Sequence, residues 1–151
     1  MTKEVFIRIL GVQTPVGEVE DGDNEPIEVV HTGTYYYKNG KHYVFYEEAV
    51  EGIKGTTKAQ IRWQTDGVLE VIKKGIANSH MIFEKNQRHT CDYQTPFGNL
   101  DLGILTKRMS CKENDDMLEI AAEYNMDVNW DPVAKCMIRI NVQPRSTEIT
   151  L

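Results

Sequence analysis

The groups with which this chain of 151 residues could do chemistry are imidazole, carboxylate, ammonium and phenol side chains that follow the alternation of β-strands. Such groups transfer protons, bind metal ions or hydrogen-bond small molecules. Counting along each strand predicts an inward position for eight of them: His31, Tyr35, Tyr37, Glu48, Lys73, His89, Tyr93 and Tyr124. Because buried polar groups need partners, such an interior suits a cavity that holds water or a ligand of mixed polarity.

Other interpretations of these residues stay open. If the tyrosines pack by their rings and place their hydroxyls at the barrel ends, the interior is filled. A filled barrel fits a protein–protein interaction module, with an exposed aromatic patch made of Tyr36, Tyr43 and Phe45. Three classes of function follow: a barrel that binds a small amphipathic or apolar ligand, a protein–protein interaction module and, as a distant third, an enzyme.

No motif in the sequence identifies a catalytic or cofactor site. Gly-x-Ser-x-Gly, a glycine-rich phosphate loop and His-Glu-x-x-His are absent. The four histidines lack the spacing of metal ligands, and the three cysteines, Cys91, Cys111 and Cys136, include no Cys-x-x-Cys pair. We therefore expect no enzyme activity, no cofactor and no metal, and we expect the cysteines to be reduced, small buried side chains.

The charge balance bears on the partners. Acidic residues outnumber basic ones by 23 to 17, which gives a net charge of −6 and disfavours binding to nucleic acid or to an anionic membrane. No run approaches the roughly 18 consecutive apolar residues of a membrane span, and the N-terminus does not resemble a signal peptide. We expect a cytoplasmic protein whose partner is a small amphipathic ligand, with a homodimer left open.

The element that positions most of the polar groups is a hairpin over residues 28–48. Its two arms are rich in β-branched and aromatic residues, and Asn39-Gly40 between them is a strong signal for a two-residue turn. Such a turn fixes four opposed pairs: Tyr37 and His42, Tyr35 and Val44, Gly33 and Tyr46, His31 and Glu48. We expect Glu48 to accept a hydrogen bond from His31, and the ring of Tyr46 to lie across Gly33.

Strand alternation continues along the chain. A three-residue loop with Gly67 in the left-handed conformation would match the apolar faces of residues 56–64 and 68–74, with Trp63 opposite Leu69. Residues 117–128 alternate with a period of two, which predicts a strand although many of them favour helices. We expect Asp131-Pro132 to form the next turn. The predicted core contains Ile61, Trp63, Leu69, Val71, Leu118, Ile120, Ile138 and Ile140.

These elements predict an all-β fold. Short antiparallel strands at regular spacing, without a convincing helix, are typical of an up-and-down barrel of eight to ten strands. At this length the chain is expected to form one domain over residues 1–151, with a frayed tail at 145–151.

Several short motifs, taken in order, are shared with a known family. They are Thr32-Gly33 with Tyr35-Tyr36, Tyr46-Glu47-Glu48, the segment Tyr93-Gln94-Thr95-Pro96-Phe97-Gly98, and Leu102-Gly103-Ile104-Leu105-Thr106. Over nearly its whole length the chain resembles the YwiB-like family of small bacterial proteins of unknown function. The resemblance implies a calycin-like β-barrel, related in architecture to lipocalins, and it carries no catalytic residues.

Overall fold

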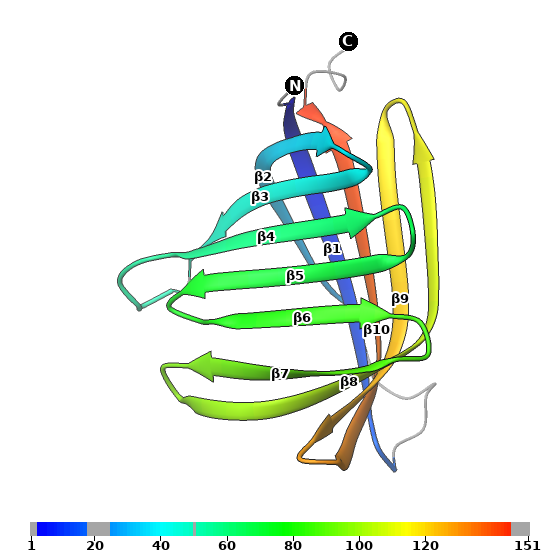
Figure 1. Cartoon of the computed structure of the whole chain (residues 1–151). Coiled ribbons are helices and arrows are strands. Elements are labelled where there is room, and N and C mark those ends of the chain that lie inside the picture. Colours follow the sequence, from blue (N-terminus) through cyan, green and yellow to red (C-terminus); the bar gives the residue numbers. More distant parts are fainter. Residues whose placement is uncertain (1–2, 18–24, 50, 146–151) are drawn as a thin grey trace.

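A computed structural model describes residues 3–17, 25–49 and 51–145. These residues form ten β-strands in one sheet (Figure 1), and they include no helix long and apolar enough to cross a membrane. The strands are β1 (Lys3–Pro15), β2 (Ile27–Lys38), β3 (Lys41–Glu48), β4 (Thr57–Gln64), β5 (Val68–Gly75), β6 (Ser79–Glu84), β7 (Arg88–Thr95), β8 (Gly98–Asn114), β9 (Met117–Val128) and β10 (Asp131–Pro144).

The sheet is antiparallel and nearly closes on itself. Its strand order is β6-β5-β4-β3-β2-β1-β10-β9-β8-β7, so consecutive strands pair with each other except β6 and β7, and the first strand also pairs with the last. The end strands β6 and β7 are joined by a tight turn and, outside the named strands, by a single bridge between Asn78 and Gln94. The predicted all-β barrel of eight to ten antiparallel strands is confirmed.

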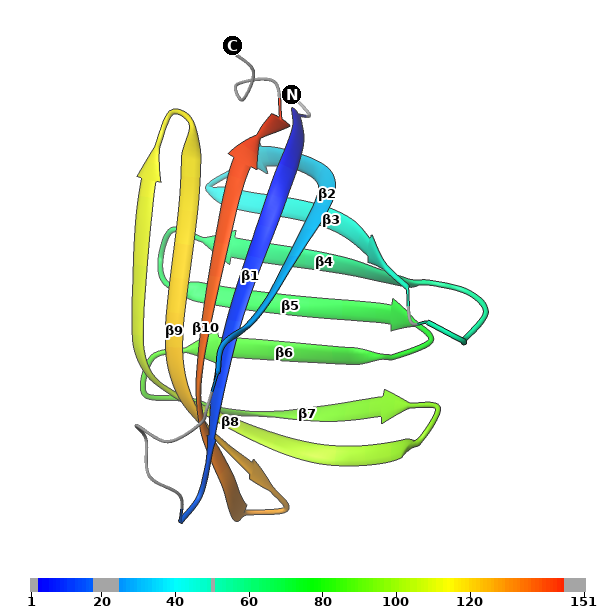
Figure 2. The ribbon, with the colours of Figure 1, turned by 180° about the vertical axis from the view of Figure 1, so that it is seen from behind.

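The strands run in two directions that cross over the core. Figures 1 and 2 show β1, β9 and β10 running steeply across β3 to β7, while the long strand β8 bends from one direction into the other. A register shift between Thr106 and Arg108, a β-bulge, lies within this strand. Because bulges increase the local twist, the shift fits the bend of β8.

The predicted turns of two hairpins are confirmed. Asn39 and Gly40 both have positive φ, 52° and 79°, and Lys38 pairs with Lys41, as a two-residue turn requires. Gly67 has φ 105°, and its N–H donates to the carbonyl of Gln64 at 2.9 Å. Trp63 consequently faces Leu69, and the apolar faces of β4 and β5 match.

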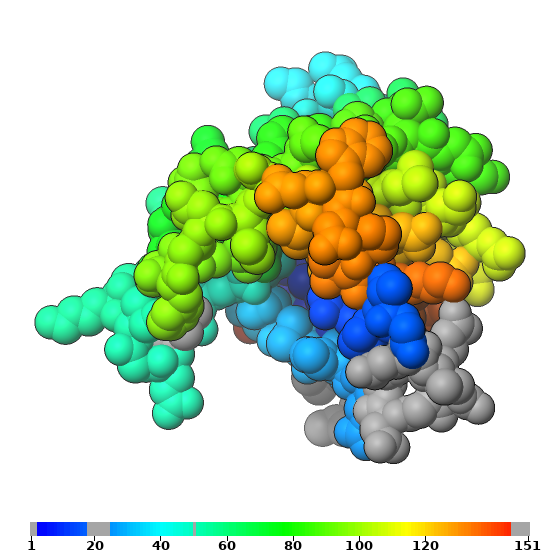
Figure 3. All heavy atoms as spheres, turned by 90° about the horizontal axis from the view of Figure 1, so that it is seen from below, coloured from blue at the N-terminus to red at the C-terminus, as the bar shows by residue number. Residues whose placement is uncertain are grey.

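The predicted turn at Asp131-Pro132 is wrong, because Asn129 and Trp130 turn the chain two residues earlier with φ of 51° and 70°. Figure 3 shows this orange β9–β10 turn between the green β7–β8 segment and the blue end of β1. The carboxylate of Asp127 accepts a hydrogen bond from the Trp130 N–H at 2.9 Å, and the Arg88 guanidinium lies 3.5 Å from the centre of the indole ring. These contacts hold Trp130 in a conformation that its side chain disfavours.

Gly33 allows β2 and β3 to approach closely. A Cβ atom at this position would collide with the carbonyl oxygen of Phe45 and lie 2.8 Å from Cδ1 of Ile7. The atoms nearest to this position are therefore backbone of β3 and a core side chain of β1. Tyr46 does pair with Gly33, as the register predicted.

Apolar side chains from both strand directions pack in the interior, and most of the predicted core is confirmed. Ile138 differs, because it is only half-buried. The predicted core residues that are buried are Ile61, Trp63, Leu69, Val71, Leu118, Ile120 and Ile140. Of the tail predicted to fray, residues 146–151 lie outside the described residues.

Candidate functional site

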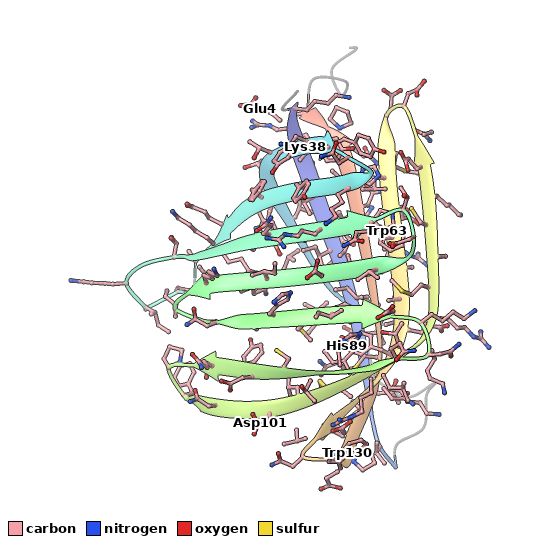
Figure 4. All side chains as sticks on the ribbon, in the orientation of Figure 1. Glu4, Lys38, Trp63, His89, Asp101 and Trp130 are labelled. Atoms are coloured by element: carbon pink, nitrogen blue, oxygen red, sulfur yellow. The ribbon has the colours of Figure 1, made fainter. Side chains whose placement is uncertain are left out.

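A small pocket lies at the end of the barrel where Figure 4 labels Glu4 and Lys38. Its volume is ≈ 70 Å³. The first residues of β1, the last residues of β10, the β8–β9 hairpin and the inward face of the β2–β3 hairpin surround it. The lining residues are Lys3, Val5, Tyr35, His42, Glu113, Asn114, Asp115, Asp116, Met117, Leu118, Val142 and Pro144.

Three side chains from three strands form a chain of polar contacts in this pocket. The hydroxyl of Tyr35 in β2 lies 2.7 Å from Nδ1 of His42 in β3. Nε2 of the same imidazole lies 3.5 Å from a carboxylate oxygen of Glu113 in β8. The His42 side chain is only 2% exposed, and its Nε2 atom makes no hydrogen bond within the described residues. A buried nitrogen without a partner, in a residue that lines a pocket, calls for a physical explanation.

The electrostatics of the site keep the imidazole neutral. Burial lowers the pKa of His42 from its ordinary value of 6.5, and the nearby Glu113 carboxylate opposes this effect only in part. Burial, followed by Glu113, raises the pKa of Tyr35, so the phenol keeps its proton. Because the Glu113 carboxylate beside Nε2 can only accept, it favours the neutral ring with its proton on Nε2, and Nδ1 then accepts a hydrogen bond from the Tyr35 hydroxyl.

His31, Glu48 and Lys73 form a second polar cluster, in which the predicted hydrogen bond is wrong. Nε2 of His31 lies 3.9 Å from Glu48, too far for a hydrogen bond, and the pairing of β2 with β3 ends at Gly33 and Tyr46, before these two residues. The carboxylate of Glu48 instead pairs with the ammonium of Lys73 at 3.0 Å. The ring of His31 stacks on Tyr46 with centroids 4.5 Å apart. The cluster links β2, β3 and β5.

The other predicted site residues do not converge on the pocket. His89 contacts Glu84 at 3.0 Å beside the β6–β7 turn, and Tyr93 is partly buried in β7. Tyr124 is a core residue whose ring meets Phe83 edge-on at 4.9 Å between centroids, and burial raises its pKa. Tyr37 was predicted to point inward, but it is half-exposed and touches His42 only with its ring, 4.8 Å between centroids.

Sequence reasoning missed two residues of the site. For His42 a signal existed, because the turn at Asn39-Gly40 places it on the same face as Tyr35. For Glu113 no local signal exists, because it reaches the pocket only through the bend of β8. The cysteines differ from expectation at one position, since Cys111 is exposed. The described residues contain no group of three or more histidine, cysteine or acidic side chains that could hold a metal ion.

Comparisons with known proteins agree with this architecture. The family model of DUF1934, a domain of unknown function, matches residues 12–140. The uncharacterized beta-barrel protein YwiB of Bacillus subtilis (strain 168) is 28% identical over 109 residues, which cover 72% of this chain and 75% of YwiB. The crystal structure of the ywiB protein from Bacillus subtilis superposes with a TM-score of 0.78 at 23% identity, covering 95% of this chain and 92% of that one, and is similar in fold.

Proposed function

Since the chain belongs to the DUF1934 family, whose function is unknown, we propose from the geometry of its end pocket that the protein binds a small amphipathic molecule there. The observation that carries the proposal is His42, which lines the pocket and whose buried Nε2 atom has no hydrogen-bond partner among the described residues. A buried donor without a partner costs about 1–3 kcal/mol, and a ligand that accepts its hydrogen bond would recover much of that.

The size of the pocket restricts the ligand. Sites for drug-sized or lipid-like molecules usually measure about 300–1,000 Å³, whereas this pocket measures ≈ 70 Å³. It accommodates a few non-hydrogen atoms, either a very small molecule or the end group of a longer one. The proposal therefore narrows the amphipathic ligand expected from the sequence to a short one, and it does not place a long apolar ligand inside the barrel.

The donors and acceptors restrict the ligand further. The N–H at Nε2 of His42 needs an acceptor, and the carboxylate of Glu113 needs a donor, 3.5 Å away. A primary amide and a hydroxyl group each supply both. Val5, Leu118 and Val142 form an apolar floor that suits a short alkyl group. The ligand class is thus a small primary amide or alcohol, rather than an ion.

Saturation-transfer NMR with propionamide as the probe tests the proposal, with propionate and propylammonium as charged controls. Propionamide should receive saturation from the protein, and both ions should bind more weakly. Glu113→Ala should weaken propionamide about tenfold, since a hydrogen bond to a charged group contributes about 1.5–3 kcal/mol. Glu47→Ala removes an exposed carboxylate of β3 and should change nothing. No transfer to the amide, or equal binding to both variants, would refute the proposal.

A second candidate function, a protein–protein interaction module, is favoured by one observation on the outer surface. Tyr36 stacks on Tyr43 and on Phe45, with centroids 4.7 and 5.8 Å apart, and these rings face away from the core. Aromatic side chains of this kind are enriched at interfaces. Sedimentation should then reveal a dimer that Tyr43→Ser dissociates, whereas a monomer at high protein concentration would count against this role in self-association.

A further inference from the structure

The outer surface of β1, β8, β9 and β10 carries three adjoining grooves, on the face turned to the viewer in Figure 2. Their volumes are ≈ 330, ≈ 390 and ≈ 510 Å³. The first and second grooves share Arg139, and the second and third share Arg108, Glu123 and Met137. We call this continuous surface the outer furrow. It shares no lining residue with the end pocket.

The floor of the outer furrow is apolar. Phe6, Leu10 and Val12 occupy outward positions of β1, and the register places Met137 beside Val12. Ala121 of β9 lies on the same face, separated from Leu10 by Arg139, which pairs with both residues. All five side chains are half-buried. From Phe6 to Val12 the row spans about 20 Å, the length of a six-residue strand.

Long basic side chains, which we call the rim, rise from the same outward face, with Arg8 between Phe6 and Leu10 along β1, although the chain as a whole has a net charge of −6. Two acidic side chains, Glu119 and Glu123, also line the outer furrow, and each lies near an arginine at 3.7–3.8 Å; a third, Glu28, pairs with Arg8 at 2.8 Å. Clustered positive charge on an acidic protein marks a place where an acidic partner can associate. The basic residues that line the furrow are Arg8, Lys107, Arg108, Lys135 and Arg139.

We propose that the outer furrow binds an extended segment of a partner protein in which acidic and apolar residues alternate. In an extended chain, side chains point alternately to opposite sides, so one row would meet the apolar floor while carboxylates from the other reach the basic rim. Single-stranded nucleic acid fits less well, because its bases stack on several aromatic rings. Among the described lining residues, Phe6 and Tyr124 are aromatic, and the ring of Tyr124 packs in the core against Phe83. The inference is independent of the proposed function of the end pocket.

Fluorescence anisotropy with a labelled octapeptide of alternating Glu and Leu tests this proposal. The acidic peptide should bind, and a Lys-Leu octapeptide of the same length should bind at least tenfold more weakly. Affinity should fall as salt rises, because the contacts on the rim are exposed. If an octanucleotide of uridine binds more tightly than the acidic peptide, or if neither peptide binds, the proposal is wrong.

Charge reversals locate the contact. The double variant Lys107→Glu with Arg139→Glu should bind the acidic peptide at least tenfold more weakly. Lys58→Glu with Lys74→Glu changes the net charge equally on the paired strands β4 and β5, where both lysines are exposed, and should leave binding nearly unchanged. Lys107→Glu alone, at an exposed residue beside the bulge of β8, repeats the test without disturbing Arg139 and Glu119. If both double variants lose affinity for the acidic peptide equally, the net charge of the protein determines binding, and the outer furrow does not.

Discussion

The hydroxyl of Tyr35 and Nδ1 of His42 are 2.7 Å apart, although the two residues are not direct partners in the β2–β3 hairpin. Tyr35 pairs with Val44 and His42 pairs with Tyr37, so the contact runs diagonally across one face of the hairpin. Diagonal neighbours lie within reach of long aromatic side chains. This contact orients the imidazole so that its second nitrogen lies toward Glu113 in the end pocket.

Removing the Tyr35 hydroxyl should destabilise the fold. Tyr35→Phe leaves the buried Nδ1 of His42 without its donor, which should lower the free energy of unfolding by about 1–3 kcal/mol in urea. Tyr37→Phe is the matched control, because this half-exposed tyrosine touches the same imidazole only through its ring. The control should change stability by less than about 0.5 kcal/mol. Equal losses in the two variants would contradict the hydrogen bond.

The lowered pKa of His42 predicts a dependence of stability on pH. In the unfolded chain the imidazole takes up a proton near its ordinary pKa of 6.5, whereas in the folded protein burial delays protonation to lower pH. The contribution of the neutral His42 to the free energy of unfolding is therefore fully present above pH 6.5. It is lost as the pH falls through 6.5 toward the pKa of His42 in the folded protein. This one group cannot change the free energy of unfolding by more than about 1.4 kcal/mol per pH unit.

Urea unfolding at a series of pH values between 7.5 and 5 measures that slope. His42→Gln should flatten it, because it removes the buried imidazole. If the parent protein and His42→Gln show the same pH dependence, the burial of a neutral His42 is not what sets it.

Alanine substitutions at two glycines in the first two strands should have different effects on stability. Gly33→Ala places a methyl group against the carbonyl of Phe45 and against Ile7, so it should cost about 1–3 kcal/mol or more, as overpacking does. At Gly11 the nearest atom to a Cβ is the carbonyl oxygen of Met137 at 4.0 Å, so Gly11→Ala should be tolerated. Thermal unfolding of the two variants decides the matter. A stable Gly33→Ala protein would mean that β2 and β3 are further apart.

The core assignment predicts the effect of truncating Ile120. This residue is 1% exposed, so Ile120→Ala should lower the free energy of unfolding by about 2–5 kcal/mol. Ile27→Ala, at an isoleucine that is 75% exposed, is the control and should cost less than about 0.5 kcal/mol. A small loss of unfolding free energy in Ile120→Ala would mean that the face of β9 assigned to the core is exposed to solvent.

Much of the fold could be predicted because strand signals are local. Alternation of apolar residues identified β9 as a strand although its composition favours a helix, and Asn39-Gly40 and Gly67 fixed two registers. The turn at Asn129-Trp130 could not be predicted in this way. Tryptophan is not a turn residue, and its conformation depends on Asp127 and on Arg88, which comes from a strand far away in the sequence.

The candidate site was predictable only in part, for the same reason. The hairpin register placed Tyr35 and His42 on one face, but the observed pairing of β2 with β3 ends at Gly33 and Tyr46, before His31 and Glu48. The register could not show that Lys73, from another hairpin, pairs with the carboxylate of Glu48, because that contact depends on how β4 pairs with both β3 and β5. Glu113 enters the site through the bulge and bend of β8, which leave no pattern in the residues themselves.

The measurement that tests the end pocket most directly is the nitrogen NMR spectrum of the His42 ring, recorded without and with propionamide. The account predicts a neutral ring at pH 7 with its proton on Nε2, with Nδ1 accepting from Tyr35, and with an Nε2 resonance that moves as propionamide is added. A proton on Nδ1, or an Nε2 resonance that stays fixed at saturating propionamide, would contradict it.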